Sequence, residues 1–348
     1  MKKPYRFLLG AVGILCYLIF LPREIGPALN LTPLAAYGYG EERLEGDTAI
    51  PFAGGSHVGF LNSDGSPRHA ERIRYGAAYS SWAILNYDSV SQNLVLTAPD
   101  GGLIMPIETR GYPLFIDQRL VVLSTDRLRI KEYSSEGELL WRRSFPSLVT
   151  TLSGGSERTV VGLLNGSFLF LDAQGDIIHR FAPEEGRIEV AYTALYDEDS
   201  SLYLLVSGID PQHAYLVEER SGEFRLMHQR RLPSDFRRNL VGGTPLPSLF
   251  VLETEEGALL LDQLTYKERL LPLPGRVVDM AGFNEERLLI FLSLTEEGYR
   301  LELRHDETYY QGEIAVDPEE EELSLMARGD KLFLFLSDAI LVYRLERG

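Results

Sequence analysis

The chain has 348 residues, 45% of them hydrophobic, which is enough apolar material to build a large buried core. Its 51 acidic residues outnumber 34 Lys and Arg and give a net charge of −17, and so acidic a surface repels phosphate backbones and excludes nucleic acid as an expected partner. The single cysteine, Cys16, excludes an internal disulfide and a thiolate metal site.

Residues 1–25 have the order of parts of a secretory signal. Lys2, Lys3 and Arg6 precede an uncharged run from Phe7 to Leu21. This run is long for a cleaved signal and short for a spanning helix, which needs about 20 residues. No Ala-x-Ala site follows it, so we expect a retained signal-anchor helix, with a cleaved signal peptide as the alternative. The positive charge before the run predicts translocation of the rest of the chain.

Beyond a linker over residues 26–55, the chain indicates an all-β domain over residues 56–348. Helical periodicity is scarce, and short runs of Leu, Val, Phe and Tyr alternate with clusters of Gly, Asp, Ser and Pro. One strongly apolar strand recurs seven times: NLVLTA from 93, RLVVLS from 119, RTVVGL from 158, SLYLLV from 201, SLFVLE from 248, RLLIFL from 287 and KLFLFL from 331.

The spacing of these strands predicts the architecture. After a first interval of 26 residues, the starting positions lie 39 to 47 residues apart, which fits four short antiparallel strands joined by tight turns. The pattern therefore predicts a seven-bladed β-propeller, with eight blades as the alternative. The C-terminal segment provides three strands of a blade, and we expect residues 56–73 to close the ring with it.

A second repeated sequence pattern, present in four segments, indicates a shared turn. YSSEGELLWRRSF from 133 aligns on its glycine with three other segments, from residues 61, 171 and 218. Their glycines are predicted to form the turn between the third and fourth strands of a blade, and they are Gly65, Gly137, Gly175 and Gly222.

The Asp/Glu-x-Gly turn, followed by apolar residues and Trp141, resembles the repeat of pyrroloquinoline-quinone-type and WD-like bacterial β-propellers. This family includes the propeller lipoprotein of the outer-membrane β-barrel assembly machinery. The resemblance covers most of residues 56–348 and implies a propeller in which Trp141 packs between blades. Alternation along a strand likewise places Trp141 and Arg143 on one face and Arg142 on the other. A propeller repeat specifies a fold and leaves the activity open.

No motif predicts catalysis, a cofactor or a metal site. The chain has no G-x-S-x-G elbow and no phosphate-binding glycine loop, and its six histidines lack the spacing of metal ligands. Asp197, Glu198 and Asp199 form an acidic stretch that we interpret as a solvated turn rather than a calcium loop. A propeller hydrolase or lyase, or a small-ligand binder that uses the axial channel, is the alternative function.

Two charge clusters suggest partner surfaces. Asp317 and Glu319 to Glu322 form an acidic run, whereas a basic cluster in an otherwise acidic domain is predicted to dock an acidic partner and contains Arg230, Arg231, Arg237 and Arg238. We therefore expect a non-catalytic, extracytoplasmic binding or scaffolding propeller of a bacterial envelope. It would be anchored in the inner membrane by its N-terminal helix, or secreted if the signal is cleaved, and would bind a protein partner.

Overall fold

The computed structural model describes residues 29–44, 46, 48–90, 92–183, 187–233, 235–305, 312–316 and 323–347. The predicted signal or anchor helix over residues 1–25 and the acidic run at 317–322 lie outside these ranges. Within them every regular element is a β-strand, and no helix is long and apolar enough to cross a membrane.

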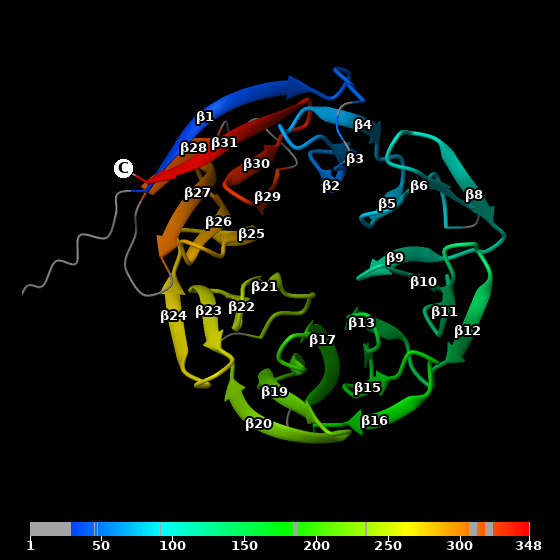
Figure 1. Cartoon of the computed structure of the whole chain (residues 1–348). Coiled ribbons are helices and arrows are strands. Elements are labelled where there is room, and N and C mark those ends of the chain that lie inside the picture. Colours follow the sequence, from blue (N-terminus) through cyan, green and yellow to red (C-terminus); the bar gives the residue numbers. More distant parts are fainter. Residues whose placement is uncertain are drawn as a thin grey trace, which may run out of the picture.

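The described strands form eight antiparallel sheets around a central axis (Figure 1). We number these sheets as blades along the chain. Blades 1 to 4 consist of β2 (Ile50–Gly54), β3 (His57–Leu61) and β4 (Pro67–Arg72); β5 (Gly76–Tyr79), β6 (Ile84–Tyr87), β7 (Leu94–Thr97) and β8 (Leu103–Ile107); β9 (Tyr112–Ile116), β10 (Arg119–Leu123), β11 (Arg129–Tyr133) and β12 (Leu139–Ser144); and β13 (Val149–Gly154), β14 (Thr159–Leu163), β15 (Phe168–Leu171) and β16 (Ile177–Phe181).

Blades 5 to 8 complete the ring. They consist of β17 (Ile188–Asp197), β18 (Leu202–Ile209), β19 (His213–Arg220) and β20 (Glu223–Arg231); β21 (Gly242–Leu246), β22 (Leu249–Thr254), β23 (Gly257–Asp262) and β24 (Glu268–Pro272); β25 (Arg276–Phe283), β26 (Leu288–Thr295), β27 (Gly298–His305) and β28 (Gly312–Val316); and β29 (Ser324–Arg328), β30 (Lys331–Phe335) and β31 (Ala339–Arg347) with β1 (Leu29–Gly38). In each of blades 2 to 7, which have four strands, the strand that comes first in the chain is the innermost.

The core lies between neighbouring blades rather than at one centre. Every residue of the second strands β14, β18 and β22 is buried, because these strands are covered on both faces by adjacent sheets. One apolar cluster, for example, combines Val121 and Ile130 of blade 3 with Val161 and Leu169 of blade 4. The continuous apolar runs in the sequence are therefore second strands buried on both sides.

The structure has eight blades, so the primary prediction of seven was wrong and its stated alternative was right. The apolar run from 93 is β7, a third strand, whereas the six later runs are second strands. This difference explains the short first interval. The second strand of blade 2 is β6, Ile-Leu-Asn-Tyr, and the strand in the same position of blade 1 is β2, Ile-Pro-Phe-Ala-Gly, so neither reads as a strongly apolar run.

The ring closes through β1, which pairs antiparallel with β31 from Leu29↔Arg347 to Gly38↔Ala339. The predicted linker over residues 26–55 thus contains two strands of the propeller, β1 and β2. Residues 56–73, expected to close the ring, instead form most of blade 1. The linker assignment failed because β1 carries Pro33 and a bulge between Pro33 and Ala35, features that weaken a strand pattern.

In the part of the chain that the structure describes, blade 1 has three strands, and none of them takes the innermost position. Its Gly65 turn joins β3 to β4 as Gly137 joins the third strand to the fourth in blade 3, so β2 corresponds to a second strand. The chain that leads into this blade follows the outer edge of β4 instead. There the amide of Ala70 donates to Glu42 Oε1 at 2.8 Å, and the amide of Arg43 donates to the carbonyl of Pro67 at 2.8 Å.

The aligned glycines share a left-handed backbone. The φ angles of Gly65, Gly137, Gly175 and Gly222 are 99°, 80°, 76° and 79°, and each residue lies in the turn before the outermost strand of its blade. A residue with a side chain is strained in this region, which is why glycine recurs there. Gly101, with φ 83°, occupies the same turn of blade 2 and is a fifth copy that the alignment missed.

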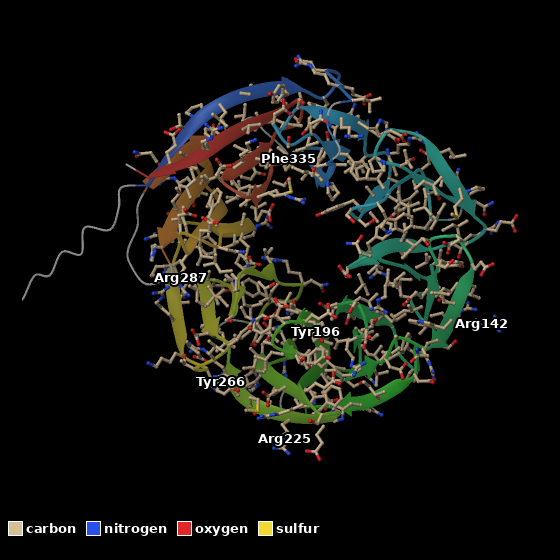
Figure 2. The ribbon with its side chains drawn as sticks, in the orientation of Figure 1. Arg142, Tyr196, Arg225, Tyr266, Arg287 and Phe335 are labelled. Atoms are coloured by element: carbon tan, nitrogen blue, oxygen red, sulfur yellow. The ribbon has the colours of Figure 1, made fainter. Side chains whose placement is uncertain are left out.

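Trp141 lies between blades 3 and 4. Its indole packs against the apolar cluster shared by these blades, and a Cβ built on Gly175 would come within 2.5 Å of its Cδ2 atom. The guanidinium of Arg143 extends to the same turn and donates to the carbonyl of Gly175 at 2.7 Å. Arg142 lies at the outer circumference and points away from the axis (Figure 2). This stretch therefore joins two blades.

Candidate functional site

The topology divides the loops between two faces of the disc. In an up-and-down blade of four strands, the turn between the second and third strands lies on the same face as the connection to the next blade. We call this face the connection face. The turns between the first and second and between the third and fourth strands lie on the opposite face, which we call the hairpin face.

The loop that connects β20 to β21, residues 232–241, lies on the connection face and carries part of the predicted basic cluster. Its backbone is held by Gln212, a fully buried residue in the turn between β18 and β19. The amide of Gln212 donates to Asp235 Oδ1 at 2.7 Å, and its side chain exchanges two hydrogen bonds with the backbone of Phe236, at 3.0 and 3.2 Å. These bonds fix the conformation of the loop.

The same loop extends toward the innermost strands rather than over the outer circumference. Asn239 Nδ2 donates to the carbonyl of Thr150 on β13 at 3.2 Å. The amide of Leu240 donates to Thr193 Oγ1 on β17 at 3.1 Å. The loop thus spans blade 5 and contacts blade 4 near the axis.

Two of the four predicted docking arginines are neutralised within the protein. Arg238 binds the carboxylate of Glu253 through both terminal nitrogens, and these hydrogen bonds raise the pKa of Arg238. Glu253 is only 1% exposed, so removing Arg238 would leave a buried carboxylate without its ion-pair partner. Arg230 pairs with Glu268, which also contacts His228 Nε2 at 2.6 Å.

The other two arginines are available to a partner. Arg231, at the end of β20, and Arg237 are both exposed, and neither forms an ion pair among the residues that the structure describes. Arg237 lies near Tyr192: burial raises the pKa of this tyrosine, and the positive charge of Arg237 opposes the rise. The basic cluster therefore consists of two structural arginines and two surface arginines, a division that the sequence pattern did not show.

The acidic stretch Asp197 to Asp199 lies on the hairpin face after β17. Glu198 accepts hydrogen bonds from the amide of Ser156 at 3.1 Å and from the hydroxyl of the same residue. Asp197 accepts a hydrogen bond from Ser200 Oγ at 2.8 Å. This turn thus connects blade 5 to blade 4 by hydrogen bonds.

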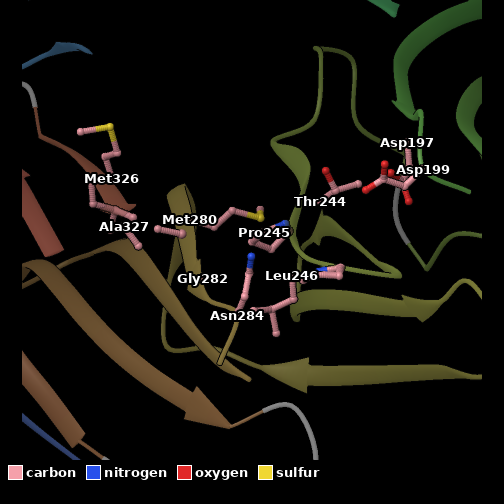
Figure 3. Close-up of a pocket in the computed structure, with 13 residues that line it drawn as sticks. Asp197, Asp199, Thr244, Pro245, Leu246, Met280, Gly282, Asn284, Met326 and Ala327 are labelled. Carbon is pink, nitrogen blue, oxygen red and sulfur yellow. The ribbon is translucent and has the colours of Figure 1, made fainter. Parts of the chain in front are cut away.

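An axial recess of about 450 Å³ opens beside this turn (Figure 3). It is the place to look for the alternative function, an enzyme or small-ligand site in the axial channel. The ends of innermost strands line it, with Asp197, Thr244 and Asn284 as polar groups and Met280 and Met326 as apolar ones. Its described lining offers carboxylate, amide and hydroxyl groups but no His, Cys, Lys or Arg. A small ligand could enter, yet these residues do not form a nucleophile–base pair of the kind used in acyl transfer.

Next to the recess, Asp279 joins the innermost strands of blades 7 and 8. Its Oδ2 accepts a hydrogen bond from the amide of Leu325 at 2.8 Å, and its Oδ1 accepts one from the amide of Met280 at 2.8 Å. Burial raises the pKa of Asp279, and the two amides oppose this rise. We therefore assign this carboxylate a structural role between blades.

Comparison with known proteins identifies the repeat. A family model described as "beta-propeller protein" matches residues 9–345. A protein of Treponema pallidum (strain Nichols) whose name is "Uncharacterized protein" is 23% identical over 361 residues, a match that covers 99% of this chain and 94% of that protein.

Two solved structures share the fold. BamB from Moraxella catarrhalis superposes with a TM-score of 0.62 and 11% identity, covering 90% of this chain and 100% of that chain. The computationally designed Ika8 protein gives a TM-score of 0.63 and 12% identity, covering 92% of this chain and 98% of that chain. Identities this low show a common architecture and leave function open.

Proposed function

Because the chain belongs to the β-propeller protein family, whose fold assigns no activity by itself, we propose a function from its surface. The protein is a non-catalytic binding or scaffolding module of a bacterial envelope, and it presents the loops of its connection face to an acidic protein partner. The loop over residues 232–241 is the centre of this surface. Arg231 and Arg237 are the residues that contact the partner.

One observation carries the proposal: two exposed arginines that form no ion pair with a described residue stand on or beside a loop that buried contacts hold at residues 235 and 236. Gln212 and the Arg238–Glu253 pair hold the loop in one conformation. Binding to a pre-organised loop avoids the entropy cost of ordering it. Complementary charge also accelerates association and selects an acidic partner, because two cations stand out in a chain whose net charge is −17.

The test is a charge reversal limited to the two available residues. The full-length chain carries Arg231→Glu and Arg237→Glu, and its partners are captured by crosslinking in its own cells and identified by mass spectrometry. The matched control carries Arg269→Glu and Arg328→Glu, which reverse two exposed arginines elsewhere and change the net charge equally. Reversal of Arg230 or Arg238 is unsuitable, because it would place two carboxylates together.

We expect the Arg231/Arg237 variant to lose at least nine-tenths of the crosslinked partner, and the control to retain it. Both variants should keep the thermal unfolding midpoint of the parent, since none of the four arginines forms an ion pair with a residue that the structure describes. If the yield of the crosslinked product is the same in the two variants, the docking surface is elsewhere and the proposal fails.

The envelope location is a separate part of the proposal and has its own test. A cysteine introduced as Arg328→Cys, with Cys16→Ser, places one thiol on the hairpin face. A membrane-impermeant maleimide should label it in cells whose outer membrane has been opened. Labelling that appears only after the inner membrane is dissolved would contradict an extracytoplasmic propeller.

A further inference from the structure

A second recess on the connection face lies between blades 2 and 3, away from the 232–241 loop. Its volume is about 460 Å³. Three cationic side chains line it, Arg110, Arg129 and Lys131, together with a single carboxylate, Glu108. Although the chain has a net charge of −17, the lining of this recess contains more cations than acids.

Lys131 is the innermost of these cations. It stands on β11 and is half-buried, and its ammonium donates to Thr109 Oγ1 at 3.1 Å. Thr109 is itself only 4% exposed, so the contact lies at the base of the recess. Among the described residues no carboxylate lies within 4.0 Å of this ammonium. Two of its three hydrogens are left for another acceptor.

Glu108, the one carboxylate of the described lining, forms no ion pair with Lys131, and the strands beside Lys131 add no other acid. The flanking strands β10 and β12 contain no acidic residue over Arg119–Leu123 and Leu139–Ser144. The nearby turn contributes Asp126, but this carboxylate pairs with Arg129 at 2.9 Å. Removing an ammonium partly from water without a counter-ion is costly, and an anion in the recess would offset that cost.

Further donors lie around the opening. Arg110 is exposed and forms no ion pair with a described residue, and the guanidinium provides a planar set of donors that matches a carboxylate or phosphate. The side chains of Asn93 and Thr125 also line the recess, and both are exposed. Their amide and hydroxyl groups can bind the polar body of a ligand.

We propose that this recess binds a small organic anion through a carboxylate or phosphate group. The oxyanion lies between Lys131 and Arg110, and the uncharged part of the ligand contacts Asn93 and Thr125. The recess is larger than a single phosphate ion requires, so the ligand is a multi-atom acid such as a sugar phosphate or a polycarboxylate. This site is separate from the Arg231/Arg237 surface and does not depend on the proposed function.

The experiment measures binding of two probes to the full-length chain by isothermal titration calorimetry. The probes are citrate and inorganic phosphate, each titrated at constant ionic strength maintained with chloride. We expect saturable 1:1 binding of citrate, and tenfold or greater weakening in Lys131→Met, which keeps the aliphatic stem and removes the charge. Lys131→Arg should retain binding and so shows that loss in the first variant does not come from misfolding.

A matched control removes the same charge from another part of the ring. Lys267 is exposed and lines a different recess, in blade 6, so Lys267→Met should leave citrate affinity within twofold of the parent. Equal weakening by Lys267→Met and Lys131→Met would show attraction by overall charge and overturn the proposal. Absence of saturable binding of both probes would also overturn it. The Arg231→Glu/Arg237→Glu variant should bind citrate normally, which separates this site from the protein-docking surface.

Discussion

The contact between Trp141 and the Gly175 turn can be tested by adding one methyl group. Gly175→Ala places a Cβ within 2.5 Å of the indole Cδ2 atom, at a residue whose φ is 76°. Gly222→Ala places the same methyl group at the equivalent turn of the next blade, where φ is 79° and no atom lies within 4 Å. The pair therefore separates backbone strain from steric overlap.

The expected magnitudes follow from these two differences. A left-handed backbone costs a residue with a Cβ about 1–2 kcal/mol, which is the whole effect expected for Gly222→Ala. Gly175→Ala adds overpacking against Trp141, for about 1–3 kcal/mol more. Its total loss in free energy of unfolding should therefore be about 2–5 kcal/mol.

Urea unfolding followed by circular dichroism measures both variants, in the parent and in a Trp141→Leu background. The smaller side chain removes the overlap, so in that background the two glycine substitutions should cost the same within about 0.5 kcal/mol. If Gly175→Ala and Gly222→Ala already cost the same with Trp141 present, the indole does not pack on this turn and the assignment of the tryptophan to the space between blades is refuted.

Two further predictions concern charges between or within blades. Arg158 of blade 4 donates two hydrogen bonds to Glu219 of blade 5, at 2.8 and 2.9 Å, and Glu219 is 9% exposed. Arg158→Met should lower the free energy of unfolding by about 3 kcal/mol, because it leaves the Glu219 carboxylate without its partner. Adding Glu219→Gln removes that charge and should recover part of the loss. A double variant no more stable than Arg158→Met would contradict this account. Burial raises the pKa of Glu219, but the hydrogen bonds from Arg158 and Tyr203 and the charge of Arg158 together outweigh burial, so the pKa is lowered. The stabilisation from this ionised carboxylate is present above about pH 4.5 and is lost as the pH falls through the folded pKa, so the difference between parent and Arg158→Met should shrink in acid. The hydrogen bond to Glu71 raises the pKa of His69, although burial opposes the rise. The stabilisation that the protonated His69 provides is therefore present below about pH 6.5 and is lost as the pH rises through the folded pKa. Glu71→Gln should lower the pKa of His69 in an NMR titration, and an unchanged titration would show that the 3.1 Å contact has no effect.

The period of the fold could be predicted from sequence because second strands are buried on both faces. Burial of every residue in β14, β18 and β22 favours runs that are mostly apolar, and these runs determine the spacing. The blade count could not be obtained in this way. The strands in the second position of blades 1 and 2, β2 and β6, are less apolar, because Pro51, Gly54 and Asn86 interrupt them.

The positions of β1 and of the surface arginines depend on contacts that no local pattern records. β1 pairs with β31 across more than 300 residues of sequence, so the periodicity of the sequence cannot identify its partner. The four arginines of the basic cluster look equivalent in sequence. Only the fold shows that Glu253 and Glu268, from the next blade, neutralise Arg238 and Arg230 and leave the other two exposed.

Both proposed sites lie on the connection face, and the repeat itself gives a reason. The turns before the outermost strands are short and are fixed by their own hydrogen bonds: Ser134 Oγ accepts from the amides of Glu136 and Glu138, and Asp172 Oδ1 accepts from those of Gln174 and Asp176. Such turns have little freedom to vary. The connections between blades are under no common constraint, and they range from three residues after β4 to ten after β20. A repeat protein acquires specific function where its loops can differ from one unit to the next, because the shared turns must keep the fold.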